Sequence, residues 1–301
     1  MIAAHTLGPH SYLWKVVYPF HMPLFFLVAG YFYKEKEGVV LFKTSFERLI
    51  KPYIFVCIII SLIRIGQQIL HSEPISINSH DILYGMGPVW FLLALFWCRI
   101  FFNYIIILFH THYLIISFLA SSFPLFFTYF SKADVPLAIL QGMSCIIFMA
   151  FGFYYHKKDF SNLNRKHLIV IFISSTFFWV ISAIYGKTDV SQCTFKLWFI
   201  DYLGALGGTY VCLFFSTYIL NLKFLAYALT KISKFSVAIL CFHTIDYVCF
   251  FWHHLYSYIR EEDIITIIIL GRIFILLFSI IITSKSLFLY HLFIKKTNKI
   301  I

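Results

Sequence analysis

The chain has 301 residues, of which 61% are hydrophobic and 12% are charged, and its formal net charge is +11. The mean hydropathy is +0.85, and apolar runs of bilayer length recur along the chain, which excludes a single water-soluble domain. The positive charge does not indicate nucleic-acid binding, because the basic residues lie at the ends of apolar runs and form no continuous basic face. The composition predicts an integral membrane protein.

Nine apolar segments each approach the roughly 20 residues that a helix needs to cross a bilayer. We therefore predict an all-α fold, a polytopic transmembrane helical bundle that forms one integral-membrane domain over residues 1–301, with no appended soluble domain. In chain order, the predicted spans are 16–33, 52–70, 88–108, 113–131, 136–155, 168–185, 197–220, 236–256 and 264–284.

The residues before the first span are small and apolar from Met1 to Gly8. One interpretation is that they are the remnant of a tenth span whose beginning is absent. An equally good one is a short extracytoplasmic tail that starts with apolar residues.

The first predicted span contains residues that plain membrane anchors avoid. His21 needs a partner or a water-filled cavity inside a bilayer, so we expect it to line a cavity. Pro19 and Pro23 bend a helix, and Gly30 permits close approach of a second helix. Packing alone also explains the two prolines and the glycine.

The Lys and Arg residues outside the spans are distributed unequally between the two membrane faces. Because cytoplasmic loops carry the excess of positive charge, we predict a cytoplasmic C-terminus and an N-terminus on the opposite side. The predicted cytoplasmic loops are 34–51, 109–112, 156–167 and 221–235.

The seven cysteines have neither CxxC nor metal-ligand spacing, and most lie within apolar runs. The spacing predicts no disulfide framework and no bound metal.

Four ordered landmarks give the chain a resemblance to a known family. They are Phe20-His21-Met22-Pro23-Leu24-Phe25-Phe26 with Gly30-Tyr31, then Arg48-Leu-Ile-Lys-Pro52-Tyr53, then Val89-Trp90-Phe91-Leu92, and Leu240-Cys-Phe-His243. Together they resemble the membrane-bound acyltransferase 3 family, in particular its fucose O-acetyltransferase-like and polysaccharide O-acetyltransferase branch. The resemblance implies a bundle of ten spans that transfers acyl groups, commonly acetyl from acetyl-CoA, to sugar hydroxyls of surface glycans.

The resemblance also implies a catalytic histidine upstream of the first landmark, and His5 fits it. A sugar hydroxyl is a poor nucleophile, so a neutral imidazole would act as its general base. The family's basic partner of this histidine would fall before residue 1, so either the true start lies upstream or the protein is impaired. A histidine at the membrane interface is the alternative interpretation. His21 is a second catalytic candidate, ranked below His5, and Trp90 is a candidate for cavity lining or support.

The acyl donor must arrive from the cytoplasm, where coenzyme A carries several phosphate charges. Arg48 offers a planar fork of donors for phosphate, and Lys43 and Lys51 lie on the same segment. The alternative is ordinary positive flanking of a span. We favour Arg48, although Ser45 stands where family members often carry a second basic residue.

Charged residues within the spans are candidates for cavity lining or support. An uncompensated charge at mid-bilayer costs about 2.5–3.5 kcal/mol, so Arg99 and Arg272 need interior partners or water. Asp201 and Asp246 could each pair with an arginine or line the acyl path. His243 shares a helix face with Asp246, which could orient its imidazole. An interhelical hydrogen bond explains His243 equally well.

These features predict an O-acyltransferase of the bacterial inner membrane. It would use acetyl-CoA or another acyl-CoA as co-substrate, with no permanently bound cofactor, and act on a glycan or polysaccharide acceptor. Membrane lipid and separate glycan-assembly proteins are the expected partners, and nucleic acid is not. One alternative is a transporter or flippase that moves a lipid-linked glycan without acyl transfer, since broken helices and intramembrane charges are common to both. A third is an inactive relic.

Overall fold

The computed structural model describes residues 12–72, 74–75, 82–83, 86–131, 135–158, 164–249, 268, 270–274, 277–278 and 281. This part of the chain is mostly helical, and seven of its helices are long and apolar enough to cross a membrane. An eighth span results if the bent pair α12 (Lys223–Ser233) and α13 (Ser236–Cys249) is one span. The predicted helical membrane bundle is therefore confirmed. The count of nine spans plus a remnant stays a prediction, because residues 1–11 and most of 250–301 lie outside the described residues.

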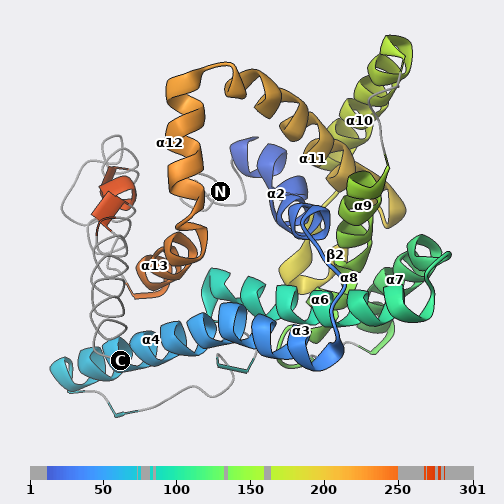
Figure 1. The fold of residues 1–301 in the computed structure, drawn as a ribbon. Helices are drawn as coiled ribbons and strands as arrows, with labels where there is room; N and C mark the ends of the chain where they lie inside the picture. The colour runs from blue at the N-terminus through green and yellow to red at the C-terminus, as the bar shows by residue number, and fades with distance from the viewer. Residues whose placement is uncertain are drawn as a thin grey trace, which may run out of the picture.

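The elements follow one another in a simple order (Figure 1). They are α2 (Tyr12–Tyr31), α3 (Gly38–Ser45), the π-helical turn η1 (Phe46–Ile50), α4 (Lys51–Leu70), η2 (Gly87–Val89), α6 (Trp90–Leu108), α7 (Tyr113–Ser131), α8 (Ile139–Ser144), α9 (Ile146–Lys157), α10 (Arg165–Tyr185), β1 (Thr188–Asp189), η3 (Val190–Gln192), β2 (Thr194–Phe195), α11 (Phe199–Leu220), α12 (Lys223–Ser233) and α13 (Ser236–Cys249).

The second span differs from its prediction, because the helix already begins at Gly38 and continues to Leu70. Residues 38–50 are therefore helical and not an irregular loop, and their cytoplasmic location stays a prediction. Pro52 suggested a helix start, since its ring clashes with the carbonyl four residues earlier in a regular helix. The π-helical turn η1 comes directly before it and changes the backbone pairing there, so the helix passes through the proline without ending.

Helix α2 lies beside α9 in the middle of the bundle (Figure 1). A Cβ atom on Gly30 would lie 1.9 Å from the Met149 carbonyl oxygen, and one on Gly152 would lie 1.9 Å from that of Leu27. Two glycines, one from each helix, therefore bring the backbones into direct contact, as membrane helices do at small-residue interfaces. This contact, the α2–α9 seam, holds the helix that carries His21.

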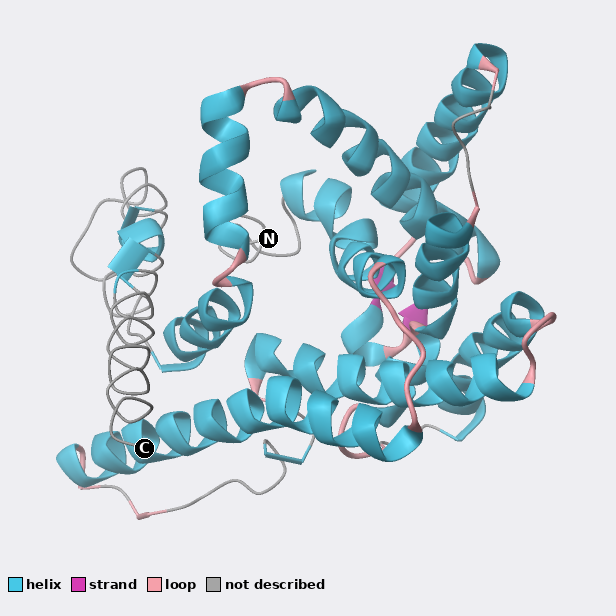
Figure 2. Ribbon diagram, viewed as in Figure 1, coloured by secondary structure: helices cyan, strands magenta, loops and turns pink. Residues whose placement is uncertain are grey.

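Helices α10 and α11 form a second interface of small residues, in which Gly204 faces Ser182 and Gly207 faces Ser175. The connection between them contains a short antiparallel hairpin, β1–η3–β2, which pairs Thr188 with Phe195 and Asp189 with Thr194 (Figure 2). The all-α prediction did not include these strands. They are too short to show an alternating pattern in the sequence, and tertiary contacts hold them in place.

Candidate active site

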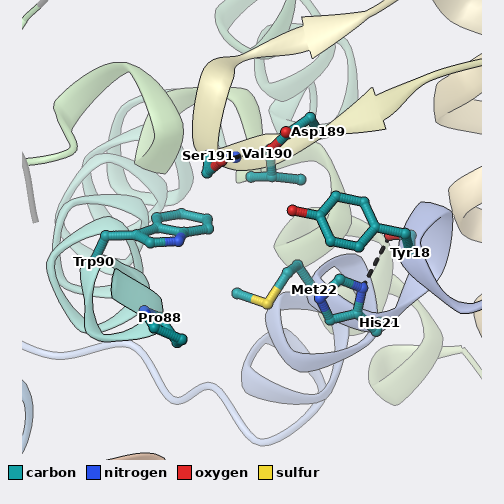
Figure 3. A pocket seen from close by; sticks show the side chains of 8 residues that line it. All are labelled: Tyr18, His21, Met22, Pro88, Trp90, Asp189, Val190 and Ser191. Carbon is teal, nitrogen blue, oxygen red and sulfur yellow. Dashed lines mark hydrogen bonds between the residues drawn. The ribbon is translucent and has the colours of Figure 1, made fainter. Parts of the chain in front are cut away.

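A small polar pocket lies where α2, the start of α6 and the hairpin meet (Figure 3). Its volume is about 30 Å³, which is enough for a group the size of a water molecule. The pocket therefore has room for one hydroxyl-sized group. It is lined by Tyr18, His21, Met22, Pro88, Trp90, Asp189, Val190 and Ser191.

His21 is buried in α2 and lines this pocket, as the sequence predicted for a polar ring inside a span. Its Nδ1 lies 3.0 Å from the backbone carbonyl oxygen of Tyr18. A carbonyl oxygen only accepts hydrogen bonds, so Nδ1 carries the hydrogen of the neutral ring and Nε2 carries the lone pair. The backbone thus selects the tautomer in which Nε2 is the basic nitrogen.

The hairpin contributes hydroxyl and carboxylate groups to the same pocket. Ser191 donates to Asp189 Oδ1 from both its Oγ, at 2.6 Å, and its backbone N–H, at 3.0 Å. The Tyr18 side chain lines the same pocket as Ser191. Gln141 Nε2 donates to the Ser191 carbonyl at 3.0 Å and so ties the hairpin to α8. These bonds fix the groups that surround the pocket before any acceptor arrives.

Trp90, the first residue of α6, is half-buried and forms one wall of the pocket. Figure 3 shows its ring and the Tyr18 ring entering the pocket from different elements. The structure thus brings together two predicted residues, His21 and Trp90, with Tyr18, Asp189 and Ser191, which the sequence analysis missed. Those three carry no motif, and only the position of the hairpin makes them neighbours.

Asp201 supports this arrangement from outside the pocket. It is fully buried, and it accepts hydrogen bonds from Ser182 Oγ at 2.6 Å and from the Leu197 backbone N–H at 2.9 Å. Among the described residues no arginine pairs with it, so the predicted pairing is not found at Asp201. Its carboxylate joins α10, the hairpin connection and α11.

A second polar group of residues surrounds Arg99 on α6. The Tyr33 hydroxyl and the Lys36 backbone N–H both donate to Asn103 Oδ1, which orients the Asn103 amide. Asn103 Nδ2 and Arg99 Nε are buried and have no hydrogen-bond partner within the described part of the chain. The two residues are one turn apart on the same face of α6.

The turn η1, which carries Arg48, packs against α6, which carries Arg99. Arg48, Arg99 and Asn103, which we call the inner donor cluster, therefore combine two positive charges with two unsatisfied buried donors. Lys51 instead forms an exposed ion pair with Glu47, at 3.8 Å, and Lys43 is exposed. The arrangement suits an anion, because buried donors need acceptors and two neighbouring cations need negative charge.

Arg272 and Asp246 form a buried ion pair, with 3.2 Å between Arg272 Nε and Asp246 Oδ2. The prediction that Asp246 could pair with an intramembrane arginine is confirmed. His243 lies one turn before Asp246 on α13 and is also buried. It lines a separate apolar cavity between α2, α6, α12 and α13, and it is not among the residues that line the polar pocket.

Two further observations limit the chemistry. Burial raises the pKa of the Cys193 thiol in the hairpin to about 12, so this cysteine stays protonated at neutral pH and is a poor nucleophile for an acyl-enzyme. Across the described residues, no group of three or more His, Cys, Asp or Glu side chains is placed to hold a metal ion. His5, the first-ranked catalytic candidate, lies outside the described residues.

Comparison with known proteins supports the resemblance seen in the four landmarks. The profile of one family, described as an acyltransferase domain, matches residues 1–284. Comparison with curated proteins gave no match, and comparison with solved structures gave none either. Since the match covers nearly the whole chain, this integral membrane protein belongs to the acyltransferase 3 family.

Proposed function

We propose that the protein is a membrane-bound O-acyltransferase that moves an acyl group from acyl-CoA to a hydroxyl of a surface glycan or polysaccharide. Membership of the acyltransferase 3 family gives the reaction class. The observation that carries the choice of a hydroxyl acceptor is the polar pocket at His21, which has room for one hydroxyl-sized group and is lined by fixed polar groups. Acetyl is the simplest acyl group for this reaction.

At the acceptor end, a hydroxyl in the pocket would lie among His21, Ser191 and Tyr18. His21 Nε2 would take the hydroxyl proton while the oxygen attacks the thioester carbon. The carbon–oxygen bond forms, the carbon–sulfur bond breaks, and the proton passes from the imidazolium to the leaving thiolate. The Nδ1–H bond to the Tyr18 carbonyl would hold the ring in place through both proton transfers.

His5 stays a candidate for the same role, as the family resemblance implies. The geometry gives His21 a stronger case than the sequence did, because its tautomer and its place in the pocket are defined. A direct transfer needs one general base, so substituting each histidine separately distinguishes which of the two is that base.

At the donor end, the inner donor cluster would bind a phosphate of coenzyme A. Arg48, in η1, supplies an exposed guanidinium, and Arg99 and Asn103 supply buried donors one turn apart on α6. Phosphate oxygens would satisfy both donors and offset the repulsion between the two arginines. Lys43 and Lys51 would contribute less, since Lys43 is exposed and Lys51 is paired with Glu47.

The cluster lies toward the end of α2 and α6 that positive-inside bias assigns to the cytoplasm, and the polar pocket lies toward the other end. The proposal therefore places the donor on the cytoplasmic side of a bacterial inner membrane and the acceptor on the outer side. Separate glycan-assembly proteins would supply the acceptor and use the product.

Transfer of labelled acetyl from acetyl-CoA to surface glycan tests the proposal in membranes that contain the full chain. We expect His21→Ala to lower transfer by about 10²–10⁴-fold, the usual contribution of a general base. His167→Ala, at an exposed position of α10, is the matched control and should transfer normally. His5→Ala in the same assay shows which histidine is the base.

If His5→Ala abolishes transfer and His21→Ala does not, His5 is the base and His21 only supports the pocket. If no acyl donor gives label in any glycan, the acyltransferase proposal is wrong. Movement of a lipid-linked glycan across the membrane would then be measured for the transporter alternative.

A further inference from the structure

An apolar cavity of about 420 Å³ lies beside the polar pocket, between α2, α6, α12 and α13. Its walls are mainly hydrocarbon, from residues such as Phe25, Leu92, Leu95 and Leu240. The polar side chains in the lining are Ser233 and Ser236, which are exposed, and the buried His243. Cavities of about 300–1,000 Å³ hold whole small ligands in other proteins.

Met22 lies between the cavity and the polar pocket, because it lines both. A group attached to a carbonyl carbon that reacts beside the polar pocket would therefore have the cavity next to it, across the Met22 side chain. On the other side, Leu49 lines the cavity and is the residue after Arg48. Leu95 also lines it and lies one turn before Arg99 on the same face of α6. The cavity thus lies between elements that carry the acceptor pocket and elements that carry the inner donor cluster.

We infer that this cavity holds the hydrocarbon chain of a medium-length acyl donor, so that the preferred acyl group is longer than acetyl. The inference rests on the proposed acyl transfer and names the donor of that reaction. An acetyl group would leave most of the volume unfilled, and unfilled apolar space loses dispersion contacts. Each methylene that moves from water into contact with the apolar walls raises the affinity for the donor by about fourfold. The affinity should therefore increase with chain length until the cavity is full.

The pantetheine arm of coenzyme A fits this cavity less well. It carries two amide groups, which need hydrogen-bond partners when they leave water. The cavity offers three polar side chains, and two of these lie on exposed positions. A membrane lipid would match the apolar walls. However, a lipid bound only as a hydrocarbon would not use the neighbouring polar pocket, which shares the Met22 wall with the cavity.

The test compares acetyl-, butyryl-, hexanoyl- and octanoyl-CoA as donors for the purified full chain with one glycan acceptor. We expect kcat/KM to rise from acetyl to hexanoyl. Leu240→Trp narrows the cavity and should lower the hexanoyl-to-acetyl ratio of kcat/KM by about tenfold. Leu62→Trp makes the same change on an exposed face of α4 and should leave the ratio unchanged.

A second measurement does not depend on turnover. A hexanoyl-CoA with a photoreactive diazirine at the chain end should label α13 near Leu240, and unlabelled hexanoyl-CoA should compete with it. Acetyl as the preferred donor, with the ratio unchanged in Leu240→Trp, would overturn the inference while acyl transfer itself stands. An equal loss for all donors would assign the cavity to the pantetheine arm. Labelling that acyl-CoA does not compete away would assign it to membrane lipid. Absence of transfer and labelling with every donor would refute the proposed function as well.

Discussion

The two sides of α2 are packed in opposite ways. On one side, Gly30 brings the α2 backbone against Met149 of α9, with no space for even one methyl group. On the other side, Met22 and Phe25 face a cavity of about 420 Å³. His21 lies next to Met22 on the same helix. The seam fixes the helix that carries the imidazole, and open space on the other side leaves room for substrate.

This difference explains why one helix carries both small and large side chains within a single span. Glycine at the seam allows two helices to approach closely. The helices then make dispersion contacts with each other in place of contacts with lipid tails. At the cavity, large side chains from five elements meet without closing the space. Packing density is therefore high where position must be fixed and low where a ligand would enter.

The largest expected effect comes from filling the seam. Gly30→Leu would force a side chain into the Met149 backbone, so we expect no folded, monodisperse protein in detergent. Gly66→Leu is the matched control, because nothing lies within 4 Å of the space its Cβ would occupy. Size-exclusion chromatography of tagged protein measures both. Recovery of folded Gly30→Leu would show that the seam is not needed.

The next effect lies on the cavity side, at the buried Asp246–Arg272 pair. Asp246→Ala removes the buried carboxylate from the guanidinium and should lower the free energy of unfolding by about 3–5 kcal/mol. Replacing both residues, as Asp246→Leu with Arg272→Met, should recover most of this loss. Thermal unfolding in detergent distinguishes the cases. If the double variant is no more stable than the single one, the ion pair is not the source of the loss.

A smaller effect is expected at Asp201, which anchors the hairpin beside the polar pocket. Asp201→Ala leaves Ser182 and the Leu197 N–H without their acceptor, at a cost of about 1–3 kcal/mol. The rate of acyl transfer should fall by more than the loss of folded protein alone would cause, because Asp189 and Ser191 lie on the same hairpin. Parallel measurements of unfolding temperature and transfer check this. Normal transfer in a destabilised Asp201→Ala protein would separate the hairpin from the acceptor site.

The smallest effect is expected at Lys51. Its ion pair with Glu47 is exposed, and such pairs contribute about 0–1 kcal/mol, so Lys51→Ala should unfold nearly as the parent does. Arg48→Ala should raise KM for the acyl donor clearly, whereas Lys51→Ala should change it little. Steady-state kinetics with varied acyl-CoA compares the two. A larger change of KM in Lys51→Ala than in Arg48→Ala would show that the acyl donor does not bind at the inner donor cluster.

Several elements of the fold could be predicted from single residues or runs. The helix starts at Tyr113 and Arg165 agree with the predicted spans to within a few residues. The second span could not be placed correctly, because the π-helical turn that accommodates Pro52 has no sequence signature. His21, Trp90 and Asp246 could be selected as polar or landmark residues inside spans. Tyr18, Asp189, Ser191 and Asn103 could not, since nothing local distinguishes them from other polar residues.

The sequence by itself determined the class of the protein. A bilayer offers no hydrogen bonds to the backbone, so long apolar runs must become helices, and their order along the chain follows from hydropathy. The tertiary structure alone decided which side chains meet. Tyr18 and Ser191 line one pocket because α10 and α11 are held together by small residues and Asp201 fixes the hairpin between them. The cavity likewise depends on the 71° bend between α12 and α13, which places His243 opposite α2 and α6. Contacts between distant segments depend on how whole helices pack, and no local pattern in the chain records that.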